Sequence, residues 1–140
     1  MTSKEYLRQI KLLDIRIQKK KDQLEDLKDR AQSVSSQPTD SIRVQSSKDG
    51  DTIGKKVVQY ADLEAEIVED TQEFIQAKNS ILNQILQLND ARYVELLCKR
   101  YVEYKKFELI AVEMVYDFDY VRAMHKHALQ AFANMYGLEE

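Results

Sequence analysis

Two rows of apolar side chains, with members spaced alternately three and four residues apart, constrain the fold of this chain more than any other feature. Such spacing places all members of a row on one face of an α-helix, as in a coiled coil. We therefore expect two long helices, one beginning at a Thr2 or Ser3 cap and one running from about Asp51 to Leu88. Glu5 adds a favourable charge to the first turn. The first row is Tyr6, Ile10, Leu13, Ile17, Leu24, Leu27, Ala31 and Val34, widened by Leu7, Leu12 and Ile15, and the second is Tyr60, Leu63, Ile67, Phe74, Ala77, Ile81, Ile85 and Leu88.

Each apolar row has one polar interruption, near Lys20 in the first and at Asp70 in the second. Two long helices joined by one loop usually form an antiparallel hairpin. With the fold-back near residue 44, Leu24 faces about Ile67 and Lys20 falls near Asp70. A polar pair of this kind can fix the register of two helices. The alternative is that both side chains lie at a flank of the pair and reach water.

The segment between the rows, residues 33–54, holds the only Pro and two of the three Gly of the chain. This composition predicts an exposed polar loop, and its length favours either disorder or a function. The piece "IRVQSS" alternates as a strand does, so it either docks or stays free. We expect proteases to cut between about Val34 and Thr52 if the loop is free.

Charge and composition limit the possible functions. The net charge is −3, and residues 81–140 carry seven basic and nine acidic side chains. This balance argues against a strong autonomous nucleic-acid binder, so DNA binding must rest on a local basic strip. No apolar run approaches the roughly 20 residues that span a bilayer, and the start lacks the apolar stretch of a signal peptide. The single cysteine, Cys98, is expected to be a small buried residue in a cytoplasmic protein.

The second half of the chain predicts a separate domain of three helices at 89–140, after a helical arm at 1–88. Asn89 or Asp90 caps a first helix, "KKFELIAVEM" forms a short second one, and "VYD" breaks the chain. A longer helix, "FDYVRAMHKHALQAFANMY", then ends at Gly137. The expected fold class is all-α, a long antiparallel helical hairpin followed by a trihelical helix-turn-helix domain.

Apolar spacing around the "VYD" break is typical of a helix-turn-helix. Ala111 is the small residue that such a motif needs where its helices cross, and Ile110, Met114, Tyr116, Val121 and Met124 occupy the inner positions, continued by Ala128, Leu129 and Phe132. The outer face of the second helix would enter a major groove, and Lys105 and Lys106 would lie near the phosphate backbone. The candidate DNA-binding residues are Lys105, Lys106, Phe118, Asp119, Tyr120, Arg122, Ala123 and Lys126, with His125 as a further possibility on the outer face.

The stretch "LNDARYVELLCKRYVEYKKFELIAVEMVYDFDYVRAMHKHALQAF" resembles region four of bacterial sigma factors. The resemblance rests on Leu88 and Arg92 at the opening, the Arg100–Tyr101 pair, Ile110–Ala111, Val121 and Ala128–Leu129. Together with "MTSKEYLRQIKLLDIRI" and "RVQSS", the whole chain resembles small phage and prophage proteins of Gram-positive hosts, described as a domain of unknown function with a sigma-like C-terminus. The resemblance implies control of transcription through promoter DNA and RNA polymerase.

Departures from the sigma pattern lower the expected DNA affinity. The usual turn glycine is Val115, so no free left-handed residue is expected there. Asp117 replaces the usual Ser cap and remains a competent cap, but Asp117 and Asp119 place negative charge where phosphates would approach. Leu109 replaces the Glu of the scaffold helix.

Other side chains favour structural roles. Arg92 and Arg100 are expected to be partly structural, with ion pairs to Glu95, Glu103 or Glu113 as an equal alternative. His125 and His127 lack the i,i+4 spacing of a helical metal pair. We expect no metal site, no cofactor, no small-molecule substrate, no membrane partner and no enzymatic activity, because the chain has no Ser-His-Asp set, phosphate loop or HExxH motif.

Three functions remain open from the sequence. The first is a phage-derived, sigma-like transcription regulator that binds double-stranded DNA, with RNA polymerase as a further candidate partner and the helical arm setting a homo-oligomer. The second is a DNA-packaging component similar to a small terminase subunit, which also joins a helix-turn-helix to a helical arm. The third is a non-enzymatic helical adaptor whose helix-turn-helix has lost DNA binding.

Overall fold

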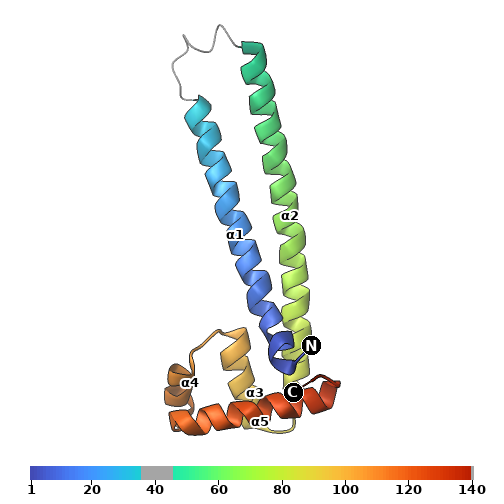
Figure 1. Ribbon diagram of the computed structural model, residues 1–140, viewed down its shortest axis with the longest axis vertical. Coiled ribbons are helices and arrows are strands. Elements are labelled where there is room, and N and C mark those ends of the chain that lie inside the picture. Colours follow the sequence, from blue (N-terminus) through green and yellow to red (C-terminus); the bar gives the residue numbers. More distant parts are fainter. Residues whose placement is uncertain (36–45, 140) are drawn as a thin grey trace. The chain divides into compact units, whose positions relative to one another are not determined.

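The computed structural model describes the backbone of residues 1–35 and 46–139 and the side chains of residues 1–30 and 58–139. Over these residues the secondary structure is helical, with one isolated bridge between Thr2 and Glu139 (Figure 1). The prediction of an all-α protein is confirmed. The elements are α1 (Ser3–Ser35), α2 (Ser46–Leu86), α3 (Ala91–Leu97), the π-helix η2 (Cys98–Val102), α4 (Phe107–Met114) and α5 (Phe118–Tyr136).

The start of α1 is fixed by a capping box, as the sequence predicted for Thr2. The backbone N–H of Glu5 donates to Oγ1 of Thr2 at 3.2 Å, and the N–H of Thr2 donates to Oε2 of Glu5 at 2.9 Å. These reciprocal bonds satisfy two donors that the first turn of a helix leaves free. The same bond to Thr2 lowers the pKa of Glu5, which favours its charged form.

The chain divides into two compact units. The multi-helix unit is Met1–Asp14 with Glu73–Glu140, and the two-helix unit is Ile15–Gln72. This division differs from the predicted boundary at residues 88 and 89. The reason is that apolar side chains from the first turns of α1 and the last turns of α2 share a core with α3 and α5. That core is Leu7, Ile10, Ile81, Ile85, Leu97, Tyr101, Ala128 and Phe132.

Polar and aromatic contacts reinforce this core where α1, α2 and α5 meet. The rings of Tyr6 and Phe132 lie 5.9 Å apart between centroids. The hydroxyls of Tyr6 and Tyr136 donate to the side-chain and backbone oxygens of Gln84 at 2.6 and 2.7 Å. Hydrogen bonds, as well as apolar burial, therefore join α1, α2 and α5 within the multi-helix unit.

Within the two-helix unit, ion pairs join later positions of α1 to earlier positions of α2, so the helices run antiparallel. Nζ of Lys20 lies 2.5 Å from Asp70 and 3.6 Å from Glu66, and Lys28 lies 3.2 Å from Glu64. The predicted pairing of Lys20 with Asp70 is confirmed. Ile17 and Leu63 are buried here, whereas contact between Leu24 and Ile67, which are both half-buried, stays a prediction.

Two side chains do not widen the apolar face of α1 as predicted. Leu12 is 55% exposed and Ile15 is 44% exposed. One helix presents only a limited stripe to a single neighbour, and the stripe of α1 runs through Leu7, Ile10 and Ile17 instead.

The predicted loop at 33–54 is too long. Helix α1 continues to Ser35 and α2 begins at Ser46, so Gly50 and Gly54 lie inside α2. Each glycine costs a helix only about 1 kcal/mol relative to alanine, and a helix of 41 residues tolerates that. Residues 36–45, with most of "IRVQSS" and the expected cutting sites there, lie outside the described residues.

Candidate nucleic-acid interface

The start of α3 is tied to α5 through Arg92. Asp90 caps α3, because its side chain accepts from the backbone N–H of Arg92 at 2.9 Å. The Arg92 guanidinium lies 2.9 Å from the same carboxylate and also donates to the hydroxyl of Tyr120 at 2.9 Å. Asp90, one of the two predicted caps, is therefore confirmed. Arg92 pairs with this cap rather than with Glu95, Glu103 or Glu113.

The turn between α4 and α5 closes with a left-handed residue that the sequence did not predict. Val115 has φ 60° and ψ 49°, although a valine is rarely found there. Its N–H donates to the carbonyl of Val112 at 3.3 Å, and the N–H of Tyr116 donates to Ala111 at 3.0 Å. These two bonds form a Schellman motif with Val115 in the position usually held by glycine. The expectation that no left-handed residue is available at this turn is therefore wrong.

The inner faces of α4 and α5 pack as their spacing predicted. Ile110 and Ala111 of α4 are buried against Val121 and Met124 of α5, together with Leu96 of α3. The small side chain of Ala111, 6% exposed, lies where the helices approach. Tyr116 differs from the prediction, because it is 38% exposed and packs on the Tyr120 ring at a centroid distance of 5.0 Å. Tyr116 therefore lies on the surface of the turn between α4 and α5.

The outer face of α5 is exposed as predicted, with one exception. The guanidinium of Arg122 lies 5.7 Å from the centre of the Phe118 ring, at the first turn of the helix. Asp117 is the N-cap residue, but its side chain makes no capping bond. The exposed members are Phe118, Asp119, Tyr120, Arg122, Ala123 and Lys126.

The exception is His125, which is buried and 7% exposed. Its Nε2 shares a hydrogen bond of 2.7 Å with the Tyr101 hydroxyl, and the Phe107 ring packs edge-on against it at 4.9 Å. Burial lowers the pKa of His125 to about 4, and the nearby cations Arg100, Lys4 and Arg8 act in the same direction. His125 is therefore a neutral core residue and does not belong to the outer face.

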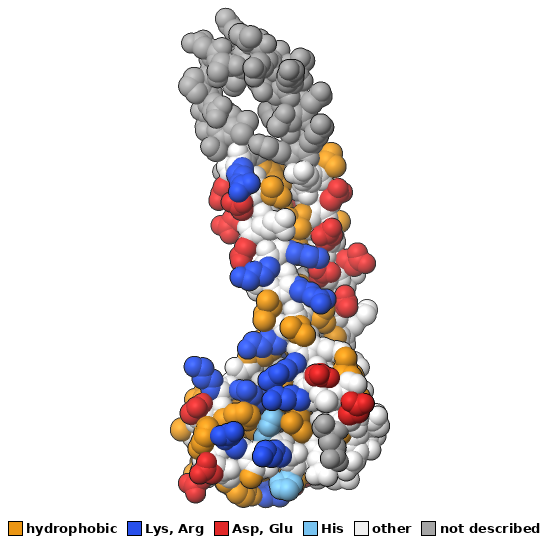
Figure 2. Space-filling model, in the orientation of Figure 1, with side chains coloured by type: hydrophobic (Ala, Val, Ile, Leu, Met, Phe, Trp, Pro, Cys, Tyr) orange, Lys and Arg blue, Asp and Glu red, His pale blue; other side chains and the backbone are white. Residues whose placement is uncertain are grey.

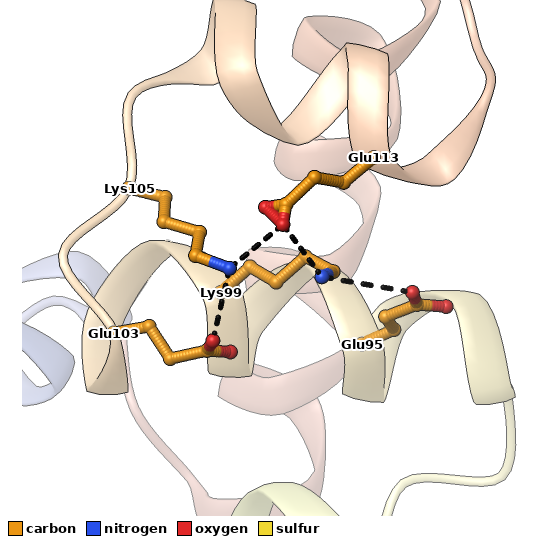
Figure 3. A network of polar contacts seen from close by, with 5 residues as sticks. All are labelled: Glu95, Lys99, Glu103, Lys105 and Glu113. Carbon is orange, nitrogen blue, oxygen red and sulfur yellow. Dashed lines mark hydrogen bonds and ion pairs between the residues drawn. The ribbon is translucent and has the colours of Figure 1, made fainter.

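Lys105, predicted to contact phosphate, is held in a network of charges (Figure 3). Its Nζ lies 2.7 Å from Glu113 of α4 and 3.1 Å from Glu103. Lys99 of η2 lies 3.4 Å from the same oxygen of Glu113 and 4.0 Å from Glu95. Hydrogen bonds to Lys105 and Lys99 lower the pKa of Glu113. This network neutralises Lys105, whereas Lys106 is exposed.

The same network overturns the predicted ion pairs of Arg100. The three glutamates are occupied by Lys99 and Lys105, and Arg100 instead donates to the backbone carbonyl of Lys105 at 3.0 Å. Its guanidinium also lies 4.1 Å from the centre of the Phe107 ring. Sequence reasoning did not single out Lys99, although its i,i+4 spacing from Glu95 was a usable signal.

Three comparisons, with models of protein families, with curated proteins and with solved structures, found no match for this chain. Among the described residues, no group of three or more His, Cys, Asp or Glu side chains is arranged to hold a metal ion. No helix in the described part of the chain combines the length and apolar character needed to cross a membrane.

Proposed function

We propose that this chain is a DNA-binding transcription regulator of the helix-turn-helix class, related to phage proteins with a sigma-like C-terminus, in which α5 enters the major groove. The observation that carries the proposal is the arrangement of α4, a three-residue turn and α5. The turn is residues 115–117, and Ala111 and Val121 pack where the helices approach. Short turns with a buried small residue are typical of this motif.

The exposed side chains of α5 support groove binding. Arg122 and Lys126 are one helical turn apart, and neither forms an ion pair within the described residues. An arginine in this position can donate two bonds to a guanine, and the small Ala123 beside it allows close approach to bases. Phe118 and Tyr120 offer apolar surface to thymine methyl groups. Arg122 is thus the side chain best suited to read a base.

Carboxylates at the start of α5 point to moderate, salt-sensitive affinity. Asp117 and Asp119 are exposed, and negative charge near phosphates opposes binding. Lys105 adds little, because Glu113 and Glu103 neutralise it. Affinity therefore has to come from Arg122, Lys126 and Lys106, and from a second protein such as RNA polymerase or from a second copy of this chain.

The test is selection of bound duplexes from a random pool, followed by titration of a selected and a scrambled duplex. We expect Arg122→Ala to reduce the preference for the selected site by about 1–3 kcal/mol, because a base contact is lost. Lys106→Ala should weaken both duplexes equally and lower the salt slope by about one. Lys105→Ala should change binding less than Lys106→Ala does.

Arg16→Ala is the matched control for Arg122→Ala, since it removes an exposed arginine from the two-helix unit. It should bind both duplexes as the wild type does. The proposal is overturned if the wild-type protein binds no duplex even at low salt, or if it binds without any preference and Arg122→Ala changes nothing.

A protein-binding adaptor is the second candidate, and one surface favours it. Val112 is 74% exposed and Val115 is 86% exposed, and Tyr116 and Tyr120 line the same shallow surface. Glycine would take the left-handed conformation of Val115 without steric cost, so valine there places an apolar group on the surface. Absence of DNA binding, together with loss of a bound protein partner on Val112→Ser, would favour this candidate over DNA binding.

A further inference from the structure

Basic side chains near the start of α1 form one row. Lys4, Arg8 and Lys11 are spaced four and three residues apart, which places them on one face of a helix. All three are exposed. At 1.5 Å per residue, the row spans about 10 Å, comparable with the axial rise of three phosphates along one DNA strand at about 3.4 Å each.

This row adjoins the outer face of α5 within the multi-helix unit. Thr2, Ser3 and Lys4 line one surface hollow together with Lys126 and Leu129. The charges of Arg100, Lys4 and Arg8 all act on the buried His125 beneath. Figure 2 shows Lys and Arg side chains gathered around histidine on this face of the molecule.

The cations of this face differ from other cations of the chain, because no carboxylate among the described residues forms an ion pair with them. Lys20, Lys28, Lys99 and Lys105 are all ion-paired. In contrast, the described part of the chain gives no ion pair to any member of what we call the basic face. Its members are Lys4, Arg8, Lys11, Arg100 and Lys126. Lys11 lies over the Tyr104 ring at 5.9 Å and Arg100 lies over the Phe107 ring at 4.1 Å.

We infer that the basic face holds the sugar–phosphate backbone of duplex DNA beside the groove that α5 enters. The inference rests on the proposed function, because Arg122 lies one turn before Lys126 on α5. A duplex that receives Arg122 in its groove brings a flanking backbone to Lys126 and then to Lys4 and Arg8. A cluster of long cationic side chains without ion pairs among the described residues suits a row of phosphates. Contacts to phosphates position a protein on the duplex without reading its sequence. In this arrangement the start of α1 becomes part of the nucleic-acid interface.

The test compares two double variants of the full-length chain that each remove two positive charges from α1. Lys4→Gln with Arg8→Gln acts on the basic face, and Lys19→Gln with Lys21→Gln acts on exposed lysines of the two-helix unit. Affinity for a selected and a scrambled duplex is measured at several salt concentrations. We expect the first variant to lose about ten-fold or more in affinity for both duplexes at about 100 mM salt, with the salt slope lowered by about two.

The control variant should stay within about two-fold of the wild type, and both variants should keep wild-type helicity by circular dichroism. If the wild type and the Arg122→Ala pattern behave as proposed while Lys4→Gln/Arg8→Gln matches the control, the inference fails and the proposed function stands. If Lys4→Gln/Arg8→Gln weakens binding evenly but Arg122→Ala keeps its site preference, the basic face is supported and groove reading by α5 is overturned. A wild-type protein that binds no duplex overturns both.

Discussion

At the scale of single residues, Val115 shows what periodicity cannot predict. Hydrophobic spacing identified Ile110, Ala111, Val121 and Met124 as inner positions, and these are buried. It could not identify the backbone conformation of Val115, because a left-handed valine is disfavoured and only the need to end α4 imposes it. The Schellman bonds from Val115 and Tyr116 satisfy the last carbonyls of the helix.

We expect Val115→Gly to stabilise the protein by about 1 kcal/mol. A left-handed conformation costs a residue with a side chain about 1–2 kcal/mol, and the added freedom of glycine in the unfolded chain offsets about half of the gain. Little packing is lost, because Val115 is 86% exposed. Val112→Gly, at a helical position 74% exposed, is the matched control and should cost about 0.5 kcal/mol. Urea unfolding measures both, and destabilisation by Val115→Gly would show that its side chain has a partner.

His125 and Lys105 mark two different limits of residue-level prediction. Position 125 follows Val121 by four residues and precedes Ala128 by three, so helical spacing alone could have placed it on the buried face. Helical spacing could not have predicted that the charge of Lys105 is neutralised. That neutralisation depends on Glu113, eight residues later on α4, which comes close to Lys105 only in the folded chain.

The titration of His125 predicts a loss of stability in mild acid. Its folded pKa of about 4 is below the ordinary value of 6.5, so the folded state binds fewer protons between these values. The stability that neutral His125 contributes is therefore fully present above pH 6.5 and is lost as the pH falls from 6.5 toward 4. Between neutral pH and pH of about 5 the free energy of unfolding should fall by about 2 kcal/mol from this group. Tyr101, Arg100, Lys4 and Arg8 surround it and carry no negative charge that could offset this cost.

Urea unfolding at several pH values tests this prediction with two histidine variants. His125→Gln should flatten the dependence between pH of about 7 and about 5, while His127→Gln, at an exposed position, should keep it. Equal pH dependence in wild type and His125→Gln would mean that His125 becomes charged in the folded state without cost.

At the scale of elements, the sequence predicted α5 to the residue, Phe118–Tyr136, whereas it placed the start of α2 too late. A fold-back near residue 44 gave the antiparallel register that brings the two polar interruptions together, and Lys20 lies beside Asp70 as expected. The π-helix at Cys98–Val102 had no signal in the sequence. It places an extra residue in the helical ladder, with the N–H of Glu103 bonded to the carbonyl of Cys98 at 3.0 Å. Tyr101 within this π-helix is buried in the core. The sequence around it has the pattern of an ordinary helix, so local propensity does not reveal the irregularity.

The Lys20–Asp70 pair should behave as a unit when its members are replaced by leucine. Asp70→Leu leaves the partly buried Lys20 without its closest carboxylate, so the melting temperature should fall. The double variant Lys20→Leu/Asp70→Leu should recover most of this loss, because apolar pairs often replace buried ion pairs without destabilisation. Glu69→Leu, at an exposed neighbouring position, is the control and should have little effect. Thermal melts of the wild type and these three variants decide, and a double variant that melts no higher than Asp70→Leu would show that the two side chains do not act as a unit.

At the scale of the whole molecule, one unit is a continuous stretch of the chain, whereas the other joins two stretches that are far apart in the sequence. The two-helix unit draws on neighbouring stretches of one hairpin, and its register was predictable from spacing. The multi-helix unit joins the first fourteen residues to residues 73–140, and the predicted boundary at residue 88 missed this connection. Apolar spacing predicts which face of a helix is buried, but it does not predict which element packs against that face. Leu7 and Ile10 were therefore assigned to the helical pair, although they pack in the core with Ala128 and Phe132.

This shared core has a consequence for synthesis on the ribosome. Ala128 and Phe132 leave the ribosome more than a hundred residues after Leu7 and Ile10, although all four share one core. The bond from the N–H of Ser3 to the carbonyl of Glu139, at 3.0 Å, comes later still. The α1 and α2 segments can pair while translation continues, because hairpin contacts need only the chain up to α2. The shared core of the multi-helix unit must wait, because it can close only once α5 has left the ribosome.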